Sequence, residues 1–252
     1  MNHGIIRKEE IELMNKHFNQ GKYSTLIDMY VGSTRYSRGL TPLMLAAAMG
    51  HYHVCEYLII RQNADVEARD DDQNTALIAA SRNNKKDVVK LLLDHNCNVK
   101  AQDKCENHAA YFAAENGNLE ILKCLVEKER NVIDLMGEKG TPLMVASFPG
   151  RISVCKFLIG MNADVNVQNK IGNTALHRAC FYNEIDVVKI LLSNGAMDLK
   201  NVSNESASDF ARRQKHEKIV DILAKNFNGT RKGTYFAKKG SKRIVIKRDK
   251  PF

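Results

Sequence analysis

The sequence predicts an all-α solenoid, in which helix-turn-helix units stack on one another and are joined by hairpin-like turns. A short block beginning with Thr recurs along the chain about every 33 residues, and a second, aliphatic block follows it each time in the same phase. Hydrophobic residues make up 44% of the 252 residues, which is enough for a sizeable core. A fixed period of this length is typical of repeat architectures, whose units bury their apolar faces only against their neighbours.

The first block predicts the first helix of each unit. It begins at Thr41, Thr75, Thr141 and Thr174, and the copy between the second and third of these begins at His108. Proline follows Thr at 42 and 142, and the first turn of a helix tolerates proline because its N–H has no helical partner. The Thr hydroxyl can form a hydrogen bond within the same turn. Small residues in this block, such as those at 46–47 and 113–114, let two helices approach closely.

The second block predicts the second helix of each unit. It occupies residues 54–59, 88–93, 121–126, 154–159 and 187–192 and carries the larger aliphatic side chains. Between the two helices the chain must turn back, a place suited to a residue in the left-handed conformation. Glycine or asparagine stands at each of these turns, as Gly50, Asn84, Gly117, Gly150 and Asn183. A third block with Asn and Asp, at 63–66, 97–99, 162–165 and 195–198, supplies turn chemistry before the next unit.

Together the blocks read T-P-L-x-x-A, V-V-x-L-L-L and A-D-V at a period of 33, which resembles the ankyrin repeat. We expect a degenerate N-terminal repeat at 5–38, five repeats at 39–204 and a degenerate C-terminal cap at 205–226. A basic and flexible tail should follow at 227–252. The resemblance implies one continuous array, and it implies a protein partner bound on the concave face of that array.

In ankyrin repeats, two consecutive positions after the small-residue pair usually project onto the concave face. By this resemblance, the candidate partner-binding residues are Met49, Arg82, Asn83, Glu115, Asn116, Phe148, Phe181 and Tyr182. The series changes from small or polar residues to aromatic ones along the chain. We expect the three aromatic residues to lie roughly 10 Å apart on neighbouring repeats, as helix packing distances require. They either form exposed hot spots for a partner or lie in the grooves between repeats.

The tail carries most of the net charge of +9. Residues 227–252 hold nine basic residues and one acid, a net charge of +8, so the other 226 residues sum to about +1. The tail candidates are Arg231, Lys232, Lys238, Lys239, Lys242, Arg243, Lys247 and Arg248. Four roles remain open: a signal for an import receptor, a contact with nucleic acid or another anionic surface, pairing of residues 244–246 with a partner or the cap, and a solvated tail.

No catalytic residues, cofactor site or metal site are predicted. His95, Cys97, Cys105 and His108 match no standard zinc spacing, and none of the six cysteines forms a C-x-x-C pair. No apolar run approaches the roughly 20 residues of a membrane helix, and the N-terminus does not resemble a signal peptide. We therefore expect a monomeric intracellular protein, cytoplasmic, nuclear or both. A non-enzymatic adaptor or scaffold is the favoured function, with a nuclear or nucleic-acid-associated regulator and an ankyrin-type inhibitor or effector as alternatives.

Overall fold

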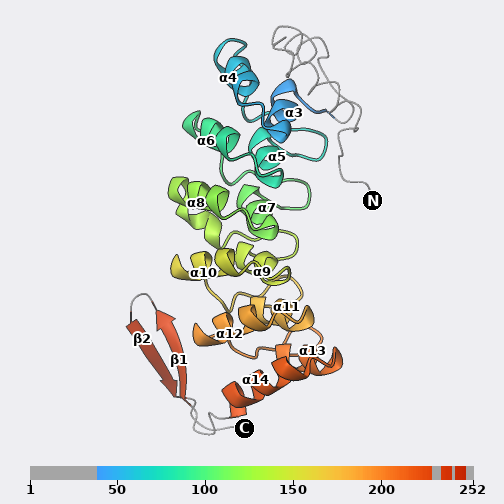
Figure 1. Cartoon of the computed structure of the whole chain (residues 1–252), viewed down its shortest axis with the longest axis vertical. Helices are drawn as coiled ribbons and strands as arrows, with labels where there is room; N and C mark the ends of the chain where they lie inside the picture. The colour runs from blue at the N-terminus through green and yellow to red at the C-terminus, as the bar shows by residue number, and fades with distance from the viewer. Residues whose placement is uncertain (1–38, 229–233, 240–241, 248–252) are drawn as a thin grey trace. The chain divides into compact units, whose positions relative to one another are not determined.

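The structure is a computed structural model, and it describes residues 39–228 together with two strands at 234–239 and 242–247 (Figure 1). The predicted N-terminal repeat at 5–38 lies outside the described residues. The described part of the array consists of paired helices, as the repeat pattern predicts. These are α3 (Pro42–Met49), α4 (Tyr52–Ile60), α5 (Ala76–Arg82), α6 (Lys86–Asp94), α7 (Ala109–Asn116), α8 (Leu119–Lys128), α9 (Pro142–Ser147), α10 (Ile152–Gly160), α11 (Ala175–Phe181), α12 (Ile185–Ser193), α13 (Ala207–Arg213) and α14 (Glu217–Asn228).

The described residues group into two compact units. The first holds residues 39–113 and 120–130, and the second holds 114–119 and the residues from 131 onward. The sequence predicts one continuous array, whereas this division falls in the repeat that lacks the A-D-V block. A short 3-10 helix, η1 (Arg130–Ile133), stands in place of that block.

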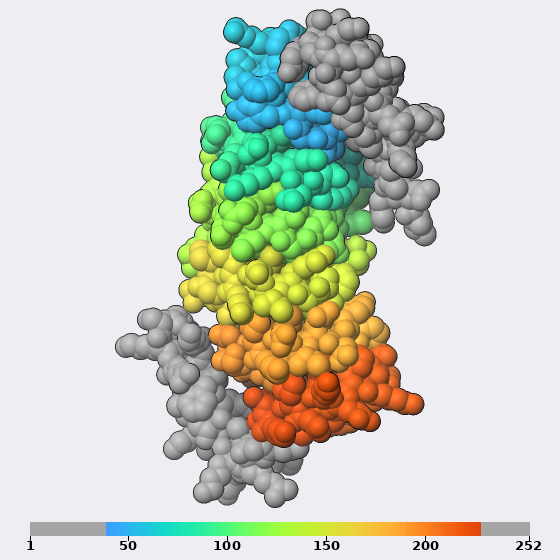
Figure 2. Space-filling model, in the orientation of Figure 1, coloured from blue at the N-terminus to red at the C-terminus, as the bar shows by residue number. Residues whose placement is uncertain are grey.

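Within each unit, the first and second helices of the repeats form two layers (Figure 1). In the first unit α3 packs against α5 and α4 packs against α6. In the second unit α11 lies between α9 and α13, and α12 contacts both α10 and α14. The space-filling view shows successive helix pairs of the second unit, yellow to red, packed directly against one another (Figure 2).

Each first helix begins at a residue that accepts a hydrogen bond from the backbone three residues later. In four repeats this residue is a threonine, whose Oγ1 atom lies 3.2 to 3.5 Å from the backbone nitrogen that donates. These residues are Thr41, Thr75, Thr141 and Thr174. In the copy that lacks Thr, Nδ1 of His108 accepts from the N–H of Tyr111 at 3.4 Å. Helices need such an N-cap because their first N–H groups have no partner within the helix.

The turns between paired helices adopt the left-handed conformation that the sequence predicts. The φ angle is 81° at Gly50, 57° at Asn84, 79° at Gly117, 66° at Gly150 and 64° at Asn183. Such φ values cost glycine little, and asparagine tolerates them because its short side chain can form local hydrogen bonds.

The core consists of aliphatic side chains from the second helices packed on small residues of the first. Val89, Leu92, Leu122 and Leu158 are fully buried, and so is Ala46 in the first layer. Burying one such large aliphatic side chain contributes about 1.5–3 kcal/mol. The small residues bring the two layers close together, so the stacking within each unit supplies most of the stability of these short helices.

The tail contains a two-stranded antiparallel hairpin. Strand β1 (Thr234–Lys239) pairs with β2 (Lys242–Lys247). Aromatic and β-branched residues favour strands, and in this register Phe236 lies opposite Val245. The segment 244–246 therefore pairs with residues 235–237 of the same tail.

Candidate functional site

A repeated side-chain motif holds the hairpin-like loops at the ends of the repeats. In four of these loops one Oδ1 atom accepts hydrogen bonds from the backbone N–H groups two and four residues later, at 2.7 to 3.2 Å. These residues are Asp70, Asp103, Asn169 and Asn201. Asp and Asn form such turns because their short side chains reach the backbone ahead of them. The loops are therefore fixed by their own sequence and can present the residues at their tips in defined positions.

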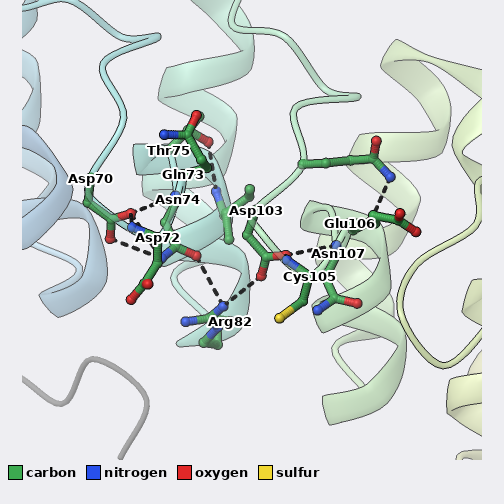
Figure 3. Close-up of polar contacts among 12 residues, drawn as sticks. Asp70, Asp72, Gln73, Asn74, Thr75, Arg82, Asp103, Cys105, Glu106 and Asn107 are labelled. Carbon is green, nitrogen blue, oxygen red and sulfur yellow. Dashed lines mark hydrogen bonds and ion pairs between the residues drawn. The ribbon is translucent and has the colours of Figure 1, made fainter.

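Arg82, a predicted partner contact, connects two neighbouring repeats of the first unit (Figure 3). Its Nη2 atom donates to Oδ1 of Asn74 at 3.1 Å and to Oδ2 of Asp103 at 3.4 Å. The guanidinium group also lies 4.0 Å from the centre of the Phe112 ring. The side chain is still 36% exposed, whereas that of Asp103 is only 8% exposed. Arg82 thus contributes to the packing of the repeats, a role that the sequence analysis did not assign.

The other four polar or aliphatic candidates differ in exposure. Met49 and Glu115 are half-buried, and Asn83 and Asn116 are exposed. The side chain of Asn83 donates to the carbonyl oxygen of Ala79 at 2.8 Å, at the end of α5. The Glu115 carboxylate lies 4.0 Å from Nζ of Lys139.

The three aromatic candidates lie together in the second unit and form what we call the aromatic cluster, with Phe210 as its fourth member. The ring centres of Phe148 and Tyr182 are 5.0 Å apart, as are those of Phe181 and Tyr182. Phe181 lies 5.9 Å from Phe210. The expected spacing of roughly 10 Å, taken from helix packing distances, is wrong for the rings. Side chains from adjacent helices lean toward each other across the space between the helix axes.

The sequence left open whether the aromatic residues are exposed or lie in the grooves between repeats, and the rings of the aromatic cluster combine both alternatives. Phe210 is buried, Phe148 and Phe181 are half-buried, and Tyr182 is 47% exposed. The cluster therefore fills the groove between repeats with some of its rings and exposes the edge of others. Aromatic rings at this spacing stabilise one another by about 0.5–1.5 kcal/mol per pair.

Two exposed aliphatic residues at loop tips of the second unit were not among the predicted site residues. Ile171 is 53% exposed and Val202 is 74% exposed. Their loops are in contact, because the N–H of Val202 donates to the carbonyl oxygen of Ile171 at 3.2 Å. The sequence does contain a signal that could have identified both positions, namely an aliphatic residue between polar neighbours in a tight loop. Exposed apolar side chains of this size are typical of interaction surfaces when they gather in one region.

Several buried titratable groups have structural roles. Nδ1 of His177 accepts from the N–H of Thr174 at 3.1 Å, and its Nε2 lies 3.2 Å from the carbonyl oxygen of Glu205 in the next repeat. Desolvation lowers the pKa of His177 below its ordinary value. Burial likewise raises the pKa of the Cys55 thiol to about 12 and that of the Cys155 thiol to about 11. These thiols are protonated and shielded, which does not suit a nucleophile.

The described part of the chain shows neither a metal-binding cluster nor a helix that could span a membrane. In that part, no group of three or more His, Cys, Asp or Glu side chains is arranged to hold a metal ion. None of the helices described there combines the length and the apolar character needed to cross a membrane.

The basic tail is only partly described. Lys238, Lys239, Lys242, Arg243 and Lys247 lie in the two strands. Arg231, Lys232 and Arg248 lie outside the described residues.

The stacked helix pairs, their capped first helices and their fixed loop tips define a helical repeat protein. The family model for ankyrin repeats matches the chain in three overlapping copies, over residues 12–103, 97–169 and 148–233. The chain belongs to the ankyrin-repeat family, as the sequence pattern predicts. Ankyrin repeats are protein-interaction modules, and proteins of this family are generally non-enzymatic.

Individual relatives share the repeats but are much longer proteins. The chain is 28% identical over 183 residues to the ankyrin repeat domain-containing protein SAT10 of Stachybotrys chartarum, which covers 72% of this chain and 8% of that protein. It is 35% identical over 86 residues to the palmitoyltransferase ZDHHC17 of Homo sapiens, a match that covers 33% of this chain and 14% of that protein. It is 39% identical over 69 residues to protein fem-1 homolog C of Bos taurus, a match that covers 24% of this chain and 11% of that protein. The chain thus matches only 8% to 14% of the length of these three curated relatives.

Proposed function

We propose that this chain is a non-enzymatic adaptor that binds a protein partner through the aromatic cluster of its second unit. The observation that carries the proposal is the partly exposed contact between Phe148 and Tyr182, whose ring centres are 5.0 Å apart. Tyrosine is enriched among residues that dominate binding energy, because a rigid ring loses little conformational entropy on binding and its hydroxyl can still form a hydrogen bond. The exposed Ile171 and Val202 add apolar surface in the same unit.

The partner itself would be found by affinity purification and then measured with purified proteins. We expect Tyr182→Ala to weaken binding by about 2 kcal/mol, roughly 30-fold, because a buried aromatic contact would be lost. Tyr182 is 47% exposed in the unbound chain, so its removal should leave the fold intact. Phe181 is a poorer probe because its ring packs on the buried Phe210, at 5.9 Å between centres.

A matched control is Tyr57→Ala, which removes a half-exposed tyrosine from α4 in the first unit. Its effect on affinity should be less than about threefold, or below about 0.7 kcal/mol. Equal losses for Tyr57→Ala and Tyr182→Ala, or no loss for Tyr182→Ala combined with Phe148→Ala, would contradict the proposed surface. If the partner is an enzyme, its activity with and without this chain distinguishes an inhibitor from an adaptor.

The site of action that we propose is inside the cell, in the cytoplasm, the nucleus or both. The proposal rests on the six cysteines, none of which forms a C-x-x-C pair, and on the basic tail, which fits recognition by an import receptor. Imaging of the tagged chain with and without residues 227–252 tests it, and exclusive secretion would contradict it.

A further inference from the structure

Arg178, in the helix α11, has no carboxylate partner among the residues that the structure describes. Its Nη2 atom donates to the carbonyl oxygen of Lys139, in the loop before α9, at 2.9 Å. This is the only hydrogen bond of the side chain within the described residues, where the buried Nε atom has no partner. An arginine side chain has five N–H donors. Because Arg178 is only half-buried, the donors that are neither used nor buried can reach a ligand.

Basic residues on either side of Arg178 do have a carboxylate partner. Arg213, on the adjacent helix α13, forms an ion pair with Glu205. The Nζ atom of Lys139 lies 4.0 Å from Oε1 of Glu115. Both counter-ions come from the same compact unit. The positive charge of Arg178 is therefore not balanced by a neighbouring acid, and a charge that is partly removed from water is stabilised when a ligand supplies the opposite charge.

Arg178 lies on the same face of α11 as Tyr182 of the aromatic cluster. The N–H of Tyr182 donates to the carbonyl oxygen of Arg178 at 3.1 Å, so the helical geometry continues to Tyr182. Residues four apart in a helix are neighbours on its surface, with Cβ atoms about 5–6 Å apart. Tyr182 is 47% exposed and its ring contacts that of Phe148. This surface therefore presents a cation beside the exposed edge of an aromatic pair.

We propose that Arg178 binds the carboxylate of an Asp or Glu side chain of the protein partner, beside which a large apolar side chain of the partner packs on Tyr182. The planar guanidinium group matches a carboxylate and can form two parallel hydrogen bonds with it. The bond to the Lys139 carbonyl oxygen already orders this group in the unbound chain, which lowers the entropic cost of binding. The inference rests on the proposed function, because it adds the chemistry of the partner at the same surface.

The test selects ligands for the full chain from a phage library of random peptides and measures synthetic copies of them by fluorescence anisotropy. We expect the selected peptides to carry Asp or Glu close to a large apolar residue. Arg178→Gln should weaken them by at least about tenfold, because charge-assisted hydrogen bonds are lost. Arg212→Gln is the matched control with the same net charge. It removes an exposed cation that pairs with Asp209 at 2.9 Å, and it should change the affinity by less than about threefold.

A charge reversal separates ligand binding from a purely structural role of Arg178. Selection on Arg178→Glu should yield basic peptides in place of acidic ones, while the helical circular dichroism stays unchanged. Selected peptides without an excess of acidic residues, or an equal loss of affinity in Arg178→Gln and Arg212→Gln, would overturn the inference. If Tyr182→Ala weakens the peptides and Arg178→Gln does not, the carboxylate contact is wrong and the proposed function is supported. If neither variant weakens them, both are wrong.

Discussion

Arg82→Ala should lower the free energy of unfolding by about 1–2 kcal/mol, the sum of a cation–π contact and a partly exposed ion pair. The guanidinium group lies 4.0 Å from the centre of the Phe112 ring and within 3.4 Å of Oδ2 of Asp103. At an exposed site, a cation–π contact is worth about 0.5–1 kcal/mol, and an ion pair about 0.2–1 kcal/mol. The hydrogen bond to Asn74 at 3.1 Å adds to these. The total stays modest because Asp103 keeps the two backbone hydrogen bonds of its own loop.

The assay is urea unfolding of the full chain followed by far-UV circular dichroism, at a fixed pH and salt concentration. Arg82→Lys keeps the charge but lacks the planar donor group, so we expect it to lose about half as much stability as Arg82→Ala. Lys90→Ala serves as a matched control, because Lys90 is an exposed cation on the neighbouring helix α6. Its effect should stay within about 0.5 kcal/mol.

The reasoning is refuted if Arg82→Ala changes the free energy of unfolding no more than Lys90→Ala does. In that case the contacts with Asn74, Asp103 and Phe112 would carry no net energy, and the side chain would be available to a partner as the sequence pattern suggested. A double-mutant cycle with Asp103→Ala isolates the pair itself. We expect a coupling energy of about 0.5–1 kcal/mol, since the two residues share one hydrogen-bonded network.

Three further outcomes follow from burial and backbone geometry. Desolvation lowers the pKa of His177 below 6.5 in the folded chain, so near that pH only the unfolded chain gains a proton. The free energy of unfolding therefore falls as the pH drops below 6.5. His177→Gln should flatten this loss between pH 7 and pH 5, as measured by urea unfolding. Gly172→Ala should destabilise the fold by more than about 1 kcal/mol, because φ is +77° at Gly172 and a Cβ atom would lie 2.8 Å from the backbone of the neighbouring loop. Gly160→Ala should instead stabilise the fold by about 0.4–1 kcal/mol, because a Cβ atom there would enter open space in α10. Thermal unfolding compares the two variants. A thiol reagent should label the exposed Cys105 in the native protein and the buried Cys180 only after unfolding, as mass spectrometry can show.

The sequence was a sound guide wherever a residue acts on its own backbone. The Thr caps, exemplified by Thr41, act across three residues, and the left-handed turns at Gly50 and Asn84 depend on one residue each. These features recur at a fixed spacing, so a one-dimensional pattern is enough to find them.

Side chains that act on distant residues were harder to predict. The repeat pattern did not indicate that Arg82 contacts Asp103, 21 residues later in the chain. Phe148 and Tyr182 were placed on neighbouring repeats, yet nothing in their spacing indicated that the rings would touch. Which way a ring or a guanidinium group leans depends on the space that the adjacent repeat leaves for it, and repeat spacing alone does not contain that information.

The ankyrin-repeat fold of this chain follows from local patterns, because caps, turns and apolar stripes are encoded within each repeat unit. The exposed part of the aromatic cluster is a consequence of three-dimensional packing. Tyr182 remains partly exposed while its ring contacts those of Phe148 and Phe181. The proposed binding site depends on such relations between residues, since binding requires that several side chains meet at one place.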